Sequence, residues 1–293
     1  MTHKPLDYLP PAFVAIVCTF WAVAPQAWVD SPWTIVIAAT AVPLLVQAIE
    51  AVAERHEGWR MNRREFLTDL GYVIFNTFVI GWLTTHLAED PLRSAKAALG
   101  ITTHWAMHLP FLAQVALVVV VIEFGQYLMH RAMHNTWLWY THAPHHHLTQ
   151  LNAMKGAVGN PVELFLISLS IVALFDLPTA AVLCGVNVMI VTSVFAHANV
   201  NADPPPFYSF FFTTIRHHSL HHSTGYDETR SNYANSLILL DRLFGTYREG
   251  EGVIVGQDER RRLSVWEQTL FPLRPVLDRM KAARASGRSA TAN

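Results

Sequence analysis

The sequence predicts an all-α, polytopic membrane protein with about four transmembrane helices, a helical hairpin and a histidine-rich cap on one side. Hydrophobic residues make up 52% of the 293 positions and charged residues only 15%, whereas a soluble domain is about 25% charged. Several apolar segments also approach the length of a bilayer crossing, and histidines cluster directly after some of them. These observations together favour a membrane-embedded body that carries a polar cap.

The apolar segments account for the predicted helices. A bilayer core about 30 Å thick needs roughly 20 apolar residues in a helix. Four segments approach or meet this length: Phe13 to Val29, Thr34 to Ala53, Leu70 to Leu87 and Leu109 to Tyr127. A fifth apolar region, Val162 to Ala196, is interrupted at Asp176-Leu177-Pro178. Its two halves predict a hairpin that either spans shallowly or dips into the bilayer and returns.

Basic residues in the short loops predict the orientation. The loop between the second and third segments carries Arg55, Arg60, Arg63 and Arg64, while Trp28 to Trp33, between the first two, carries only Asp30. Basic loops stay in the cytoplasm, so every dense histidine cluster is expected on the cytoplasmic face. Met1 to Pro11 lacks a signal-peptide pattern, so we expect the first segment to remain.

Composition also excludes some classes of protein. The net charge is −1, from 21 basic and 22 acidic residues, and no basic stripe predicts a nucleic-acid partner. Cys18 and Cys184 lie in apolar stretches and are too few for a disulfide framework, so we expect both in the core or facing lipid. The expected organisation is residues 1–108 as N-terminal membrane helices, 109–250 as the functional domain and 251–293 as a C-terminal segment. Residues 282–293 are expected to be disordered.

Histidines form the candidate functional site. His130 and His134 are four residues apart and would share one helix face. The motifs HAPHH and HSLHH would each place three imidazoles on one helix flank, and another histidine ends the hairpin, where an unpartnered ring is costly to bury. The candidate metal ligands are His130, His134, His142, His145, His146, His197, His218, His221 and His222. Eight or nine nitrogens exceed what one ion accepts, which predicts two metals, but imidazole suits iron, zinc, copper and nickel alike.

Polar residues near these motifs are candidates for supporting roles. Glu123 lies seven residues before His130, so it could accept the second ring N–H of a ligand histidine or hydrogen-bond to a neighbouring helix. Asn201 and Asp227 are further candidates for contacts with the ligands. Glu163 follows Asn160-Pro161 in a capping pattern, which explains it without a catalytic role.

Two histidines next to the motifs are expected not to bind metal. His147 and His217 occupy positions adjoining the HxxHH motifs. We expect them either to contact the ligand histidines without binding metal or to face solvent.

Four stretches carry a resemblance to a known family. The runs HRAMHNTWLWYTHAPHHH, FAHANVN, TTIRHHSLHHS and NYANSLILLDRLFGTY, in this order, resemble the fatty acid hydroxylase/sterol desaturase superfamily of integral-membrane di-iron oxygenases. The resemblance covers about Leu109 to Tyr247. It implies that the eight histidines of the HxxxH and HxxHH motifs bind two iron ions and that His197 matches the family's intermediate histidine.

The resemblance also implies an activity. Members use O₂ and external electrons to hydroxylate or desaturate a lipid such as a fatty acyl chain or sterol. The resemblance also covers oxidation of sterol methyl groups and ether-lipid cleavage, and we expect hydroxylation here. No cytochrome b5-like segment and no cysteine set for an iron–sulfur cluster is present in the sequence. A separate electron donor, a ferredoxin or a similar reductase system, is therefore expected. The expected location is the inner or plasma membrane of a bacterium, with the site on the cytoplasmic side.

Two other classes of function are weighed against the oxygenase. A zinc-dependent lipid hydrolase would need fewer ligands and usually a carboxylate base within the motifs, which the sequence lacks. A membrane metal-binding or transport protein would place its ligands at mid-depth in the bilayer, whereas these histidines follow the ends of the apolar segments.

Overall fold

The computed structural model describes residues 3–280, and the regular secondary structure in that range is helical. Extended pairing among these residues is limited to two isolated bridges, Glu54 with Val200 and Ser223 with Val255. The prediction of an all-α membrane protein is therefore confirmed. The predicted disordered tail, residues 282–293, lies outside the described residues.

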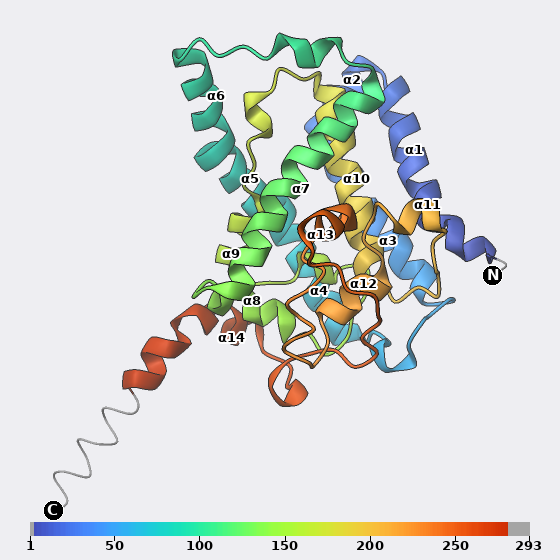
Figure 1. Ribbon diagram of the computed structural model, residues 1–293, viewed down its shortest axis with the longest axis vertical. Helices are drawn as coiled ribbons and strands as arrows, with labels where there is room; N and C mark the ends of the chain where they lie inside the picture. The colour runs from blue at the N-terminus through green and yellow to red at the C-terminus, as the bar shows by residue number, and fades with distance from the viewer. Residues whose placement is uncertain (1–2, 281–293) are drawn as a thin grey trace, which may run out of the picture.

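Five helical runs are long and apolar enough to cross a membrane. In Figure 1 they extend from the level of the cap to the top of the molecule. Their bounds are Pro5–Val23, which contains α1 (Leu9–Val23); Pro32–Glu50 (α3); Arg63–Ala98; Phe111–Asn135 (α7); and Thr179–His197 (α10). The first four correspond to the predicted segments and the fifth to the second half of the predicted hairpin.

The third run is longer than predicted. It begins at α4 (Arg63–Phe75), where the Asn62 side chain accepts the N–H of Glu65 at 3.0 Å and caps the helix. It continues through π-helical turns around α5 (Gly81–Thr84) and ends with α6 (Asp90–Ala98). Polar residues at both ends extend the helix beyond its apolar centre. The prediction, which rests on apolar residues, covered only that centre.

The hairpin forms around an interruption in the apolar chain. Its first arm is short, α9 (Pro161–Ser168) with a 3₁₀ turn at Val172–Leu174, and its second arm is α10. Asp176 accepts hydrogen bonds from the side chain of Lys96 at 2.6 Å and from the backbone N–H of Thr103 at 2.7 Å. These contacts tie the bend to α6 and its following loop.

The core of the membrane part is built around α10, which packs against α1, α3 and α7. A Cβ atom added to Gly185 would lie 2.4 Å from Val118 Cγ1, so the glycine allows α7 and α10 to approach closely. Cys184 is buried and Cys18 partly buried, with their Sγ atoms 3.9 Å apart. The expectation that both belong to the core or its lipid-facing edge is confirmed.

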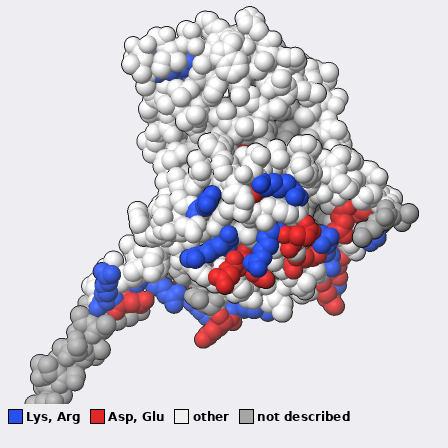
Figure 2. Space-filling view, in the orientation of Figure 1, with Lys and Arg blue, Asp and Glu red and all other residues white. Residues whose placement is uncertain are grey.

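Short helices complete the chain. One, α2 (Gln26–Val29), connects the first two spanning helices on the side opposite the cap, and the others belong to the cap or its border. These are α8 (Trp139–His146), α11 (Pro206–Ser209), α12 (Ile215–His221), α13 (Ile238–Phe244) and α14 (Val265–Leu270). Figure 2 shows charged side chains gathered on the cap, while the upper part is almost free of them on this face.

Candidate metal centre

All nine predicted ligands come together as two groups of buried histidines. Within each group, one ring nitrogen per residue lies within 4.8 Å of every other. Site A contains His130, His134, His142, His146 and His221, and site B contains His145, His197, His218 and His222. The structure thus brings these side chains together in two clusters of imidazole rings, which is the arrangement expected for two metal ions.

Helical spacing divides the motifs between the two sites. In each HxxHH motif, the first and last histidines are four residues apart and share a site, while the fourth residue points to the other site. Site A contains His142 and His146 from α8 but only His221 from the second motif. Site B contains His218 and His222 from the second motif but only His145 from α8. α7 adds two ligands to site A, and the end of α10 adds His197 to site B.

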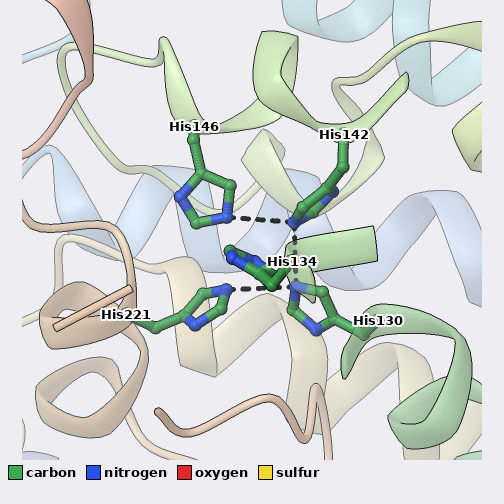
Figure 3. A group of neighbouring side chains, drawn as sticks. All are labelled: His130, His134, His142, His146 and His221. Atoms are coloured by element: carbon green, nitrogen blue, oxygen red, sulfur yellow. Dashed lines mark hydrogen bonds between the residues drawn. The ribbon is translucent and has the colours of Figure 1, made fainter. Parts of the chain in front are cut away.

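The nitrogen spacing in site A fits a metal ion. Nε2 of His142 lies 2.9 Å from Nε2 of both His130 and His146, and Nε2 of His221 lies 3.0 Å from that of His130. Two ligands about 2.1 Å from one ion and at a right angle would be about 3.0 Å apart. Figure 3 shows these four rings around a common centre, where His134 appears in this view.

The protonation of the rings favours a cation between them. Nδ1 of His221 donates to the carbonyl oxygen of Ser231 at 2.7 Å, and Nδ1 of His130 donates to that of Tyr233. Each ring therefore carries its proton on Nδ1 and directs an Nε2 lone pair into the site. Two lone pairs 3.0 Å apart repel each other unless a cation lies between them.

Other ring nitrogens have no hydrogen-bond partner among the described residues. Both nitrogens of His134 are buried and unpartnered, as are Nδ1 of His146, His218 and His222. Buried polar atoms without partners are rare and costly. A metal ion on His134 would satisfy one of them, so the donor set fits a metal better than a purely structural cluster.

Site B adjoins site A. In site B, Nε2 of His218 lies 2.9 Å from Nε2 of His197 and 3.2 Å from Nε2 of His222. The ring of His222 stacks on that of His146 from site A, with 4.5 Å between centroids. Site B offers four nitrogens and site A five, so the two ions would have different surroundings.

Burial keeps the cap histidines in the form that binds metals. It lowers the pKa of His142 to about 3, and burial and neighbouring rings hold the pKa values of His146, His218, His221 and His222 well below the ordinary value. The rings are therefore neutral at physiological pH. Neutral imidazole is the form that binds metal ions.

Glu163 contacts a ligand histidine, a role that its sequence context does not indicate. The predicted capping box is present, with the N–H of Asn160 donating to Glu163 Oε2 at 3.1 Å. The other oxygen, Oε1, lies 2.6 Å from Nδ1 of His142. The capping pattern explained this glutamate completely at the level of sequence, so nothing local indicated its second role.

The loop that precedes α9 supports site B. The carbonyl oxygen of Val158 accepts from His145 Nδ1 at 2.7 Å. A Cβ atom added to Gly156 would lie 3.2 Å from two ring atoms of His197, so the backbone of this loop packs directly against a second ligand. Residues 156–158 therefore fix the orientation of two of the four rings in site B.

A buried ion-pair network anchors this loop to the N-terminal helices. The ammonium of Lys155 lies 2.6 Å from Glu65 and 2.8 Å from Asp69 on α4. Asn152 donates to the same Asp69 at 2.9 Å, and Glu50 on α3 accepts the N–H of Ala153 at 2.7 Å. The helices that precede the histidine motifs thus help to shape the site.

Glu123 does not contact a ligand histidine. Its Oε1 accepts the N–H of Ser236 at 3.0 Å, so of the two predicted alternatives the structural hydrogen bond is present, although to a cap loop rather than a helix. That loop begins near Tyr233, whose carbonyl oxygen accepts from His130 and whose N–H donates to Asp241. The backbone of this loop therefore links Glu123 to His130.

The other two supporting candidates were wrong. Asn201 is exposed, and its N–H donates to the carbonyl oxygen of Ala53 at 2.8 Å. Asp227 is also exposed. Asn201 lies four residues after His197 and Asp227 soon after His222, but the helices end before them: α10 ends at His197 and α12 at His221.

The two neighbouring histidines lie outside both groups. His147 Nδ1 donates to the carbonyl oxygen of Ala143 at 2.7 Å, and its ring packs against Phe271. His217 forms part of the N-terminal cap of α12 with Thr214. Both side chains are buried, so the solvent-facing alternative was wrong.

Fold and site together define a class: a polytopic helical membrane protein whose cap encloses two adjacent imidazole clusters. Residues 115–246 match the family model described as fatty acid hydroxylase. This segment contains all nine histidines. Over this segment the chain is similar to the fatty acid hydroxylase family, as its histidine motifs indicate.

Individual relatives agree with this assignment. The chain is 29% identical over 220 residues to the ornithine lipid hydroxylase OlsE of Rhizobium tropici, which covers 70% of the chain and 66% of that protein. It is 27% identical to the human alkylglycerol monooxygenase and 25% identical to that of Danio rerio, covering 46% and 63% of the chain. The chain spans only 31% and 38% of these two enzymes. No solved structure matches it.

Proposed function

We propose that this protein is a membrane-bound di-iron oxygenase that hydroxylates a lipid. The observation that carries the proposal is the pair of adjacent, buried clusters of five and four imidazoles. The relatives are named as a lipid hydroxylase and as monooxygenases, which favours hydroxylation over desaturation. The overall change is R–H + O₂ + 2 e⁻ + 2 H⁺ → R–OH + H₂O, with the electrons supplied by an external donor.

The residues of this chain hold and orient the metal ions. Iron bound at sites A and B would supply the redox chemistry with O₂ that no amino-acid side chain provides. Carbonyl oxygens of Tyr233, Ser231 and Val158 hold the Nδ1 protons of three ligands, which directs their Nε2 atoms inward. Burial of the rings excludes bulk water, which protects a reactive centre from side reactions.

The proposed location is a bacterial inner or plasma membrane with the cap in the cytoplasm. The arginine-rich loop between α3 and α4 lies on the cap side, as the rule for basic loops requires of a cytoplasmic face. A cytoplasmic cap would be accessible to a small soluble reductant such as a ferredoxin. The lipid would approach from the bilayer, where the ends of α7 and α10 deliver their histidines.

Two alternatives are less well supported. A zinc hydrolase usually needs a carboxylate base beside the metal, whereas both groups among the described residues consist only of histidine. A transporter would hold its ion near the bilayer centre, whereas these ligands lie at helix ends and in the cap. Zinc has no redox chemistry, so it could not support an oxygenase reaction of the kind for which the relatives are named.

The test combines metal analysis with lipid analysis. Protein purified under anaerobic conditions from iron-supplemented cells should contain two irons per chain. Lipids of cells that express it should include a species heavier by one oxygen atom, which disappears without O₂. Hydrolysis products formed without O₂ by a zinc-loaded protein would refute the proposal.

Neighbouring histidines provide matched controls. His145→Ala should lower the metal content and abolish the hydroxylated lipid, whereas His147→Ala should keep two irons. His221→Ala and His217→Ala form the same comparison on α12. Full activity of His145→Ala would contradict the assignment of site B.

A further inference from the structure

An exposed apolar surface lies outside the membrane-spanning helices. It consists of Phe207, Phe210, Phe211, Leu243 and Phe244, which we call the aromatic platform. Their exposed fractions lie between 45% and 68%. The residues come from α11 and the turn after it and from the end of α13. None belongs to a candidate span, so their exposure requires a separate explanation.

The platform is one continuous surface. The N–H of Leu239 donates to the carbonyl oxygen of Phe211 at 3.3 Å and joins α13 to the α11 turn. Arg242 Nε donates to the carbonyl oxygen of Phe210 at 3.2 Å, and its guanidinium packs over the rings of Phe210 and Tyr247. Two segments about thirty residues apart are therefore held side by side.

This surface continues the lipid-facing side of α7. The ring of Phe244 lies 6.0 Å from that of Phe124 and stacks at 5.3 Å on Tyr127, both on α7. Phe124 and Leu128 are themselves exposed on this helix. In Figure 1, α11 and α13 lie level with the lower part of the membrane helices rather than at the base of the cap.

Arginines lie close to the platform. Arg131 follows the apolar part of α7 and donates to Tyr127 at 3.4 Å, and Arg242 lies within α13. Neither forms an ion pair within residues 3–280, whereas the cap residue Arg216 pairs with Glu249 at 3.5 Å. Aromatic side chains beside unpaired cations are typical of a membrane interface, where rings enter the acyl region and cations reach lipid phosphates.

We propose that the aromatic platform is embedded in the bilayer interface, with Arg131 and Arg242 binding the phosphates of anionic lipids. The bilayer is the favoured occupant because the platform continues the surface of a membrane-spanning helix. This contact would hold α13 in the membrane. The loop before α13 carries Tyr233, which bonds to His130, so it would also set the depth of site A.

Spin labels test this proposal in the full-length protein. Labels would be attached at Phe211→Cys, Phe244→Cys and, as the control, Val253→Cys, which is exposed on the cap. Each variant would lack Cys18 and Cys184 and would be reconstituted in vesicles of phosphatidylcholine and phosphatidylglycerol. O₂ should relax the labels at 211 and 244 more than a water-soluble nickel chelate does, with the reverse at 253.

Leu243→Cys replaces either platform variant that fails to fold. If the nickel chelate reaches the platform labels as readily as the label at 253, the platform faces water and the proposal is wrong; a protein partner would then be its occupant. The readout requires neither metal nor turnover, so it is independent of the proposed activity.

A second measurement tests the arginines. Retention of phosphatidylglycerol by the purified protein should be about fivefold weaker in Arg242→Gln or Arg131→Gln. Arg216→Gln is the matched control, because Arg216 is already paired, and it should retain lipid as the parent protein does. Equal retention in all three variants would overturn the assignment of these arginines.

Discussion

Glu163 Oε1 lies 2.6 Å from His142 Nδ1, while its other oxygen caps α9. For His142 to bind a metal through Nε2, its proton must reside on Nδ1, and the carboxylate must accept it. The Glu163 side chain therefore caps the first helix of the hairpin and also orients a ligand of site A. This arrangement joins the membrane-embedded arm to the metal centre.

Replacement of Glu163 should weaken metal binding at site A. Glu163→Gln keeps an acceptor but removes the charge, so we expect about tenfold lower affinity; Glu163→Leu removes both and should cost up to about 100-fold. Competition with a chromogenic chelator measures both values.

The control for this change is Glu267→Gln. Glu267 occupies the same capping-box position at the start of α14, where Ser264 is the cap. It should leave metal affinity unchanged. Equal losses in the two variants would mean that only the helix cap matters.

Gly156→Ala should disturb site B selectively. The added Cβ atom would meet His197 ring atoms at 3.2 Å and Ser193 Oγ at 3.0 Å, so the ring must shift by a few tenths of an ångström. We expect about tenfold weaker binding of one of the two ions, measured as metal retained after dialysis. Gly58→Ala, where a Cβ atom meets nothing within 4 Å, should retain both ions.

Lys155→Met should destabilise the fold. Lys155 and its partners Glu65 and Asp69 are all buried. This change leaves Asp69 without its cation and Glu65 with only its second partner, the partly exposed Arg262 at 2.6 Å. Breaking a buried pair in this way costs about 3–5 kcal/mol. A lower melting temperature in detergent would show it.

The corresponding exposed pair serves as the comparison. Arg93 pairs with Glu89 at 2.8 Å on the opposite side of the molecule, and both side chains are partly or largely exposed. Arg93→Gln should change stability by less than about 1 kcal/mol. Similar melting temperatures for the Lys155 and Arg93 variants would contradict the proposed anchoring role of Lys155.

Removal of metal should lower the melting temperature of the native protein. The lone pairs of His130 and His221 face each other at 3.0 Å, and a bound cation removes their repulsion. At a free metal concentration 1,000 times the dissociation constant, binding contributes about 4 kcal/mol per site. Differential scanning fluorimetry before and after chelation, and again after iron is restored, measures this effect. An unchanged melting temperature would argue against a metal in the native fold.

Local patterns were sufficient to predict the membrane helices and the nine histidines that converge. Apolar length predicts a spanning helix directly, and a spacing of three or four residues places side chains on one helix flank wherever that helix lies. The ends of the third run were missed because polar residues at Arg63 and Lys96 extend it beyond its apolar centre.

The tertiary structure decides which histidines of one motif belong to which site. Only the meeting of α7, α8, α10 and α12 assigns His145 to one site and its neighbour His146 to the other. The same packing brings Glu163 to His142 and takes Glu123 to a backbone N–H instead. Spacing along one helix is a local property, whereas the partner of a buried carboxylate depends on which distant segment packs against it.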